Sequence, residues 1–117
     1  MSKELPNSFE AEQGALGSIL QDAKILALCT EESVTPSWFY HPEHRTIFEA
    51  MIDMGDKVVD LLTVADKLRD DGDIKRIGGE VYLHKLVDAT PTTAHVHHYI
   101  RILETKHKLR KLIKISR

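Results

Sequence analysis

Cysteine is nearly absent from this chain of 117 residues, since Cys29 is the only one. A single cysteine excludes an intramolecular disulfide and any zinc or iron–sulfur site built from several thiolates, and it fits a reducing compartment. Long apolar runs are missing too: the first residues hold no apolar segment of a signal peptide, and no apolar run reaches the roughly 18 residues that span a bilayer. We therefore expect a cytoplasmic protein that is neither secreted nor inserted in a membrane.

The sequence also has no large excess of charge of one sign. It contains 16 Lys and Arg residues and 18 Asp and Glu residues, so its formal net charge is -2. This weak overall field excludes a general nucleic-acid binder, so such a role needs a local basic patch. The sequence also lacks the G-x-x-x-x-G-K-[ST] loop with which nucleotide triphosphatases hold phosphate. The composition, 42% hydrophobic and 29% charged, is that of one ordinary globular domain, and we predict no catalytic residue in it.

Helical patterns account for most of what is present. No segment shows sustained alternation of apolar and polar residues, so the sequence predicts an all-α fold, a compact bundle of about six helices. Thr35-Pro36 marks one helix start, because a proline suits the first helical turn. The other predicted helices cover residues 7–20, 23–29, 42–54, 61–69, 81–87 and 94–117.

Capping residues set the predicted starts of several helices. Asn7 and Glu10 have the spacing at which an N-cap side chain and a carboxylate three residues later satisfy each other's free backbone donors. Asp60 predicts a second N-cap. For the last helix, either Thr92 or Thr93 fits the same role.

The expected packing combines small and large residues. Gly14 and Gly17 weaken the first helix by roughly 1 kcal/mol each relative to alanine, which indicates that they admit a close neighbour. Trp38, Phe39 and Tyr40 form an aromatic cluster at a helix entry. We expect this cluster to anchor the core, since aromatic side chains bury a large area.

The last predicted helix carries basic charge together with apolar residues that continue past the expected core. From Arg101 to Arg117 seven basic residues face one acidic residue, whereas residues 49–73 are mainly acidic. A solvated helix face explains either charge run. Apolar residues without a core need a partner, so we expect the helix to fray beyond about Lys106 unless another copy pairs with it. The predicted contact residues are Tyr99, Ile102, Lys106, Leu109, Leu112 and Ile113.

Histidine is the one enriched functional residue type, with seven copies. His41 and His44, like His95 and His98, stand three apart, a spacing that can place two imidazoles on one helix face. Neither pair belongs to an H-E-x-x-H motif, and the sequence positions no third ligand, so we predict no metal site. Cys29 lies in an apolar run and is expected to be a buried, inert thiol.

Six short motifs follow one another in an order that resembles a known family, the N-terminal domain of DnaB-type hexameric replicative DNA helicases of bacteria or phages. The resemblance covers nearly the whole chain. The motifs are Leu5-Pro6-Asn7-Ser8-Phe9-Glu10-Ala11-Glu12-Gln13 with Leu16-Gly17, Phe39-Tyr40 with His44-Arg45-Thr46-Ile47-Phe48, Asp60-Leu61-Leu62-Thr63, Gly78-Gly79 with Tyr82-Leu83, Thr90-Pro91 with Ala94, and Leu109-Arg110-Lys111-Leu112-Ile113.

The resemblance implies a helical head over residues 1–93, followed by residues 94–117 as the first arm of a helical hairpin that is truncated here. It also implies a non-catalytic collar domain that supports dimer contacts and hexamer assembly and receives primase and sometimes the helicase loader. The fragment itself would need no cofactor. The parent protein would continue into an ATPase domain that uses ATP and Mg, and DNA would be contacted only through the parent ring.

Two other functions remain open at this stage. One is a stand-alone helical DNA-binding or regulatory module that uses the basic C-terminal helix on phosphates, with binding that weakens steeply with salt. The other is a small metalloenzyme based on histidine, which requires stoichiometric metal in the purified protein.

Overall fold

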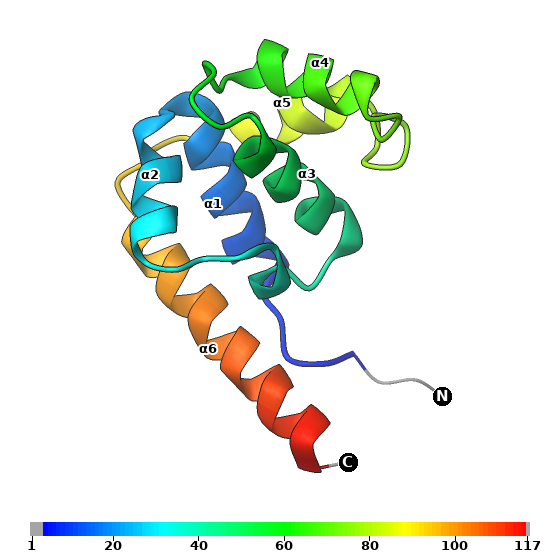
Figure 1. The fold of residues 1–117 in the computed structure, drawn as a ribbon. Helices are drawn as coiled ribbons and strands as arrows, with labels where there is room; N and C mark the ends of the chain where they lie inside the picture. Colours follow the sequence, from blue (N-terminus) through cyan, green and yellow to red (C-terminus); the bar gives the residue numbers. More distant parts are fainter. Residues whose placement is uncertain (1–3, 117) are drawn as a thin grey trace.

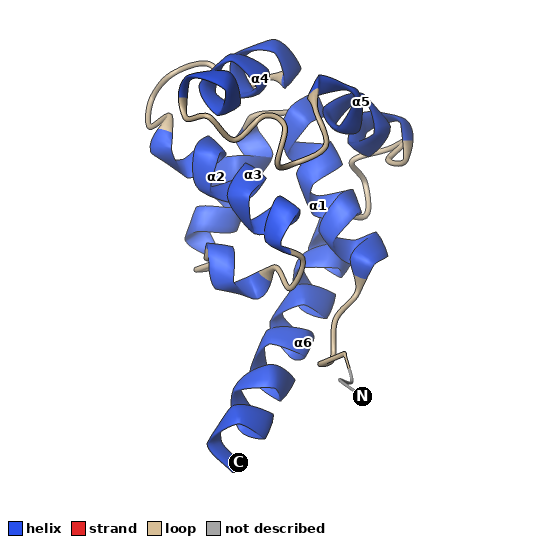
Figure 2. Ribbon diagram, turned by 90° about the vertical axis from the view of Figure 1, so that its right-hand side faces the viewer, coloured by secondary structure: helices blue, strands red, loops and turns tan. Residues whose placement is uncertain are grey.

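The computed structural model describes residues 4–116 as six α-helices and one short 3-10 turn, without a strand in that range (Figures 1 and 2). The predicted all-α fold is confirmed. The elements are α1 (Phe9–Gln21), α2 (Lys24–Glu31), η1 (Pro36–Trp38), α3 (Pro42–Asp53), α4 (Leu61–Asp70), α5 (Glu80–Asp88) and α6 (Val96–Ser116). Within the described part of the chain, no helix is both long and apolar enough to cross a membrane.

Helix α1 forms the centre of the bundle and packs against α2, α3, α5 and α6. Its two glycines allow this close packing. A Cβ atom on Gly14 would come within 3.0 Å of the Tyr99 ring on α6, and one on Gly17 would come equally close to the carbonyl oxygen of Leu86 on α5. The prediction that these glycines admit close neighbours is confirmed.

The predicted start of α1 is wrong by one residue. Ser8 is the N-cap, and its hydroxyl oxygen accepts a hydrogen bond from the backbone N–H of Ala11 at 3.2 Å. Asn7 does not cap the helix; its side-chain amide donates backward to the carbonyl oxygen of Leu5 at 2.9 Å. The nearer hydroxyl therefore takes the capping position.

The start of α4 agrees with the prediction. The Asp60 carboxylate accepts from the backbone N–H of Thr63, and the Thr63 hydroxyl accepts from the backbone N–H of Asp60, both at 2.9 Å. These reciprocal bonds satisfy two backbone donors that a helix start otherwise leaves free. The capped start of α4 follows the loop that contains Gly55 in a left-handed conformation.

Helix α6 begins at Val96, two residues later than predicted. The Thr92 hydroxyl accepts from the backbone N–H of Ala94 at 3.1 Å and so belongs to the turn before the helix. The first half of α6 buries Val96, Ile100 and Leu103 against the head. Its far end extends beyond the rest of the bundle, on the same side of the molecule as the N-terminal segment (Figure 1).

The aromatic cluster anchors the core, as predicted. Trp38 and Phe39 are buried, and the Phe39 ring lies 4.9 Å from the Phe48 ring on α3. Trp38 also stacks on His107 of α6, with ring centroids 5.7 Å apart. Trp38, at the end of η1, therefore joins the head to the middle of α6.

Candidate functional site

The residues predicted to contact a partner lie on α6, but they fall into two groups. Tyr99 and Ile102 are half-buried and pack against the core, and the Tyr99 ring fills the space that Gly14 leaves open on α1. A large part of their apolar surface is thus covered within the chain. Ile102 and Lys106 also line a shallow groove along α6, together with His98, Arg101 and Thr105.

The second group lies on the far half of α6 and is exposed. Leu109 is 40% exposed, Leu112 is 62% exposed, and Ile113 is half-buried. Ile115, which the sequence analysis did not include, is the most exposed large apolar residue described, at 80%. It was missed because it lies off the stripe formed by the others, and only the position of the helix beyond the head leaves it bare. This end of α6 therefore carries apolar side-chain surface that the rest of the described chain does not cover.

Arg110 overturns part of the sequence-based interpretation of the basic tail. Its side chain is buried, and its guanidinium donates to the carbonyl oxygens of Pro6 at 2.8 Å, Ser37 at 3.1 Å and Trp38 at 3.1 Å. The group also lies over the Tyr40 ring, 5.6 Å from its centroid. Loss of hydration on burial lowers the pKa of Arg110, partly opposed by the attraction of Glu12. Arg110 is a structural anchor and is not free to bind phosphate.

The same anchor explains why α6 differs from the expectation of fraying beyond Lys106. The helix is continuous to Ser116. The Arg110 bonds to Pro6, before α1, and to Trp38, in η1, fix the helix one turn past Lys106, and the stack of His107 on Trp38 adds an apolar contact. Burial of the His107 ring, with nearby cations, lowers its pKa and favours the neutral form that stacks on Trp38.

The remaining charges of α6 are exposed. Lys108 pairs with Glu104 one turn earlier at 3.6 Å, while Lys111 and Lys114 face solvent. Arg117, which the sequence analysis counted among the basic residues, lies outside the described residues. The usable positive charge of this end is therefore smaller than the sequence indicated.

The acidic stretch that precedes α5 is a set of surface pairs. Arg69 pairs with Asp66 at 3.0 Å and with Glu80 of α5, and Lys67 pairs with Asp71 at 3.0 Å. Exposed pairs of this kind contribute little to stability, on the order of 0–1 kcal/mol each. They support the interpretation of this run as a solvated face.

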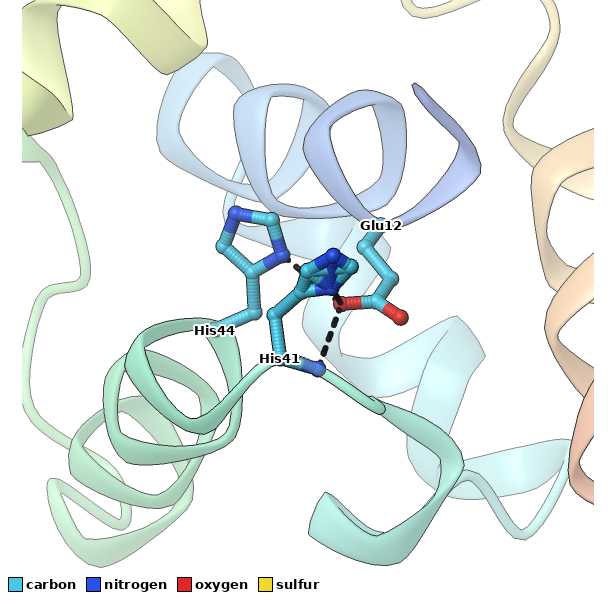
Figure 3. A group of neighbouring side chains, drawn as sticks. All are labelled: Glu12, His41 and His44. Carbon is cyan, nitrogen blue, oxygen red and sulfur yellow. Dashed lines mark hydrogen bonds and ion pairs between the residues drawn. The ribbon is translucent and has the colours of Figure 1, made fainter. Parts of the chain in front are cut away.

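Two histidines converge on one carboxylate at the start of α3 (Figure 3). Nδ1 of His44 lies 2.7 Å from Oε1 of Glu12, and Nδ1 of His41 lies 3.7 Å from the same oxygen. Glu12 is fully buried and also accepts the backbone N–H groups of Tyr40 at 2.9 Å and His41 at 3.3 Å. The carboxylate therefore satisfies free backbone donors at the start of α3. The sequence did not reveal it, because Glu12 and His44 are 32 residues apart.

Cys29 is buried in a way that keeps its thiol from acting as a nucleophile. Burial raises the pKa of the Cys29 thiol to about 11, so the thiol stays protonated at neutral pH. The expectation of an inert thiol agrees with this environment. The pair His95 and His98 is exposed and gathers no third ligand among the described residues.

The described residues form a helical domain, a head of five short helices from which the long helix α6 projects, and the projecting end exposes apolar side chains. Residues 4–105 match the family described as "DnaB-like helicase N terminal domain". The chain belongs to this family.

Two relatives and two solved structures agree with this assignment. The chain is 42% identical to the replicative DNA helicase DnaB of Geobacillus stearothermophilus and 37% identical to the replicative DNA helicase DnaC of Bacillus subtilis, over 95% of its own length and 25% of theirs. It superposes on the N-terminal domain of the Mycobacterium tuberculosis DnaB helicase with a TM-score of 0.89 and 34% identity, covering 97% of this chain and 83% of that one. A DnaB-like replicative helicase, described together with its interactions with primase, matches with a TM-score of 0.83 and 27% identity, over 93% of this chain and 26% of that one. The chain thus spans about a quarter of the length of these helicases.

Proposed function

We propose that this chain is the non-catalytic collar domain of a replicative DNA helicase, which supports assembly of the hexamer and docks primase. The observation that carries the proposal is the exposed apolar end of α6, formed by Leu109, Leu112 and Ile115, on a helix whose first half packs against the head. Exposed apolar residues grouped in this way mark a protein-contact surface.

Self-association through α6 is the first part of the proposed function. The first half of α6 is buried against the head, whereas most of the far half extends beyond it. A second helix along the exposed face would cover Leu109 and Leu112. That helix belongs to the other arm of a hairpin or to a second copy. Residues 94–117 are then the first arm of this hairpin, attached to a head over residues 1–93.

Docking of primase is the second part. It is supported by the similarity to a DnaB-like helicase described with its interactions with primase. Docking of the helicase loader follows by the same family relationship. Unwinding itself belongs to the motor of the parent protein, which would bind ATP and Mg, because this chain has no phosphate-binding loop of the G-x-x-x-x-G-K-[ST] type.

The test is the oligomeric state of the chain by sedimentation velocity over a range of concentrations. Leu112→Asp places a charge in the proposed contact and leaves the core intact, so it should weaken self-association at least about tenfold, the effect of losing roughly 1.4 kcal/mol at a contact residue. Leu62→Asp is the matched control: Leu62 is 66% exposed, on α4, away from the proposed contact. Equal association constants for the two variants contradict the proposed contact.

A binding assay separates the proposal from a stand-alone DNA-binding module. Exposed lysines on α6, including Lys111 and Lys114, favour the DNA-binding alternative, whereas the use of Arg110 within the fold argues against it. Fluorescence anisotropy with a short duplex at several salt concentrations measures the number of phosphates contacted. The collar proposal expects primase to bind and the duplex not to bind; tight duplex binding with a steep salt slope contradicts it.

A further inference from the structure

Glu12, His41 and His44 bring two imidazole nitrogens and one carboxylate oxygen to a single point where α1 meets the start of α3, with these atoms all within 4.8 Å of one another (Figure 3). We propose that these three side chains form a binding site for a divalent transition-metal ion of the Zn²⁺ type. The site goes beyond the proposed collar function, because it lies in the head and not on the exposed end of α6.

The distances are close to those of a zinc site. Zinc bonds to imidazole nitrogen at about 2.0–2.1 Å in tetrahedral sites, which places ligand atoms about 3.3 Å from one another. Oε1 of Glu12 lies 2.7 Å from Nδ1 of His44 and 3.7 Å from Nδ1 of His41. The first of these distances must widen and the second must close by about half an ångström to reach this spacing, and all three ligand atoms already lie within 4.8 Å of one another.

Nδ1 of His41 is the observation that points to a ligand. This nitrogen is buried and has no hydrogen-bond partner among residues 4–116, although the ring faces the Glu12 carboxylate. A buried polar atom without a partner is costly, and a bound ion would satisfy it. The side chain is still 17% exposed, which leaves an approach for an ion from solvent.

The groups around the three ligands hold them in place. The backbone N–H of Tyr40 donates to Oε2 of Glu12 at 2.9 Å, and that of His41 donates to Oε1 at 3.3 Å; these bonds orient the carboxylate so that Oε1 faces both imidazole rings. Nε2 of His44 lies 2.5 Å from the Tyr82 hydroxyl, a group that can donate or accept. With Nδ1 on the metal, Nε2–H donates to Tyr82. Outer partners of this kind fix the tautomer of a metal-bound histidine.

The ligand set selects the kind of ion. Two imidazoles and one carboxylate suit Zn²⁺ and neighbouring transition metals, whereas Mg²⁺ and Ca²⁺ prefer oxygen ligands. An ion held by three protein ligands would take water as its fourth. Such an ion would connect α1 to the start of α3, so binding should stabilise the folded head selectively.

The experiment titrates the full 117-residue chain, prepared without a histidine tag and freed of metal, with Zn²⁺ by calorimetry and with Co²⁺ by visible absorption. We expect one ion per chain, intense tetrahedral Co²⁺ bands, and a midpoint of thermal unfolding that rises with Zn²⁺ concentration. His41→Phe keeps a ring next to Phe9, 4.9 Å away in the native chain, but removes the nitrogen. Its affinity for Zn²⁺ should fall more than about 100-fold, beyond the 10–100-fold cost of losing an outer partner.

His98→Ala is the matched control, because it removes an exposed histidine of α6 and leaves Glu12, His41 and His44 unchanged. It should bind Zn²⁺ as the native chain does. A second variant, His41→Ala, keeps the test valid if the phenylalanine ring does not fit, since the His41 side chain makes no capping bond to α3. Absence of one-to-one binding, or loss of binding in His98→Ala with retention in both His41 variants, overturns the proposal.

Discussion

The guanidinium of Arg110 donates a hydrogen bond to the carbonyl oxygen of Pro6, a residue 104 positions earlier in the chain. The bond joins the middle of the far half of α6 to the segment that precedes α1. A second set of bonds, to Ser37 and Trp38, joins the same side chain to η1. The direction in which α6 leaves the head is thus fixed by polar contacts to backbone, in addition to apolar packing.

Replacing Arg110 should therefore loosen the far half of α6. Arg110→Met keeps the apolar stem but leaves three backbone carbonyls without their donor, and we expect unfolding free energy to fall by about 2 kcal/mol. Urea unfolding measures this loss, and hydrogen exchange should show faster exchange over residues 111–116. Lys111→Met is the control at an exposed neighbour. Equal stability of the two variants would show that the Arg110 bonds contribute nothing.

The two glycines of α1 should respond differently to a methyl group. Gly17→Ala forces a Cβ atom against the backbone of Leu86 and the Thr90 side chain, so we expect a loss of about 1–3 kcal/mol despite the better helix propensity of alanine. Gly14→Ala meets only the Tyr99 side chain, which can rotate away, and should cost less. Thermal unfolding of both variants provides the comparison, and a larger loss at Gly14 contradicts this explanation.

Cys29 predicts a dependence of stability on alkaline pH. Burial raises the pKa of its thiol from 9.0 to about 11 in the folded chain. Between these values the unfolded thiol is ionised while the folded thiol keeps its proton. The contribution of Cys29 is therefore complete below about pH 9 and declines as pH rises toward 11. Unfolding free energies of the native chain and Cys29→Ala, measured across this range, should converge as pH rises; a constant difference excludes the effect.

Local features of the fold could be predicted from the sequence because their partners are neighbours in the chain. Asp60 and Thr63 are three residues apart, so the spacing alone identifies the cap. Asn7 also has the spacing of a cap, yet the helix begins one residue later with Ser8 as the N-cap, while the Asn7 amide bonds to the carbonyl oxygen of Leu5. Competition between adjacent caps depends on geometry that spacing does not contain.

Features that join distant segments were not predictable in this way. Arg110 looked like one more basic residue of a solvated tail, since its partners are backbone carbonyls and carbonyls leave no mark in the sequence. The sequence shows no third metal ligand close to His41 and His44 in the chain. In the structure this third group is Glu12, which lies on another helix, α1. The exposed apolar end of α6 could be predicted at Leu109 and Leu112, because apolar residues continue there past the expected end of the core. The role of these residues as contacts stays a prediction.

The length of α6 has a geometric consequence for any assembly built on it. A helix rises about 1.5 Å and turns about 100° per residue, so the 21 residues of α6 form a rod about 31 Å long. The bonds of Arg110 fix the rotation of this helix about its own axis relative to the head. One residue inserted after Arg110 would move Leu112 and Ile115 only slightly outward, yet it would turn them by more than a quarter of a circle. The rotation of α6 about its own axis therefore sets the direction from which a bound molecule approaches the head. An assembly of several copies is more sensitive to this rotation than to the length of the helix.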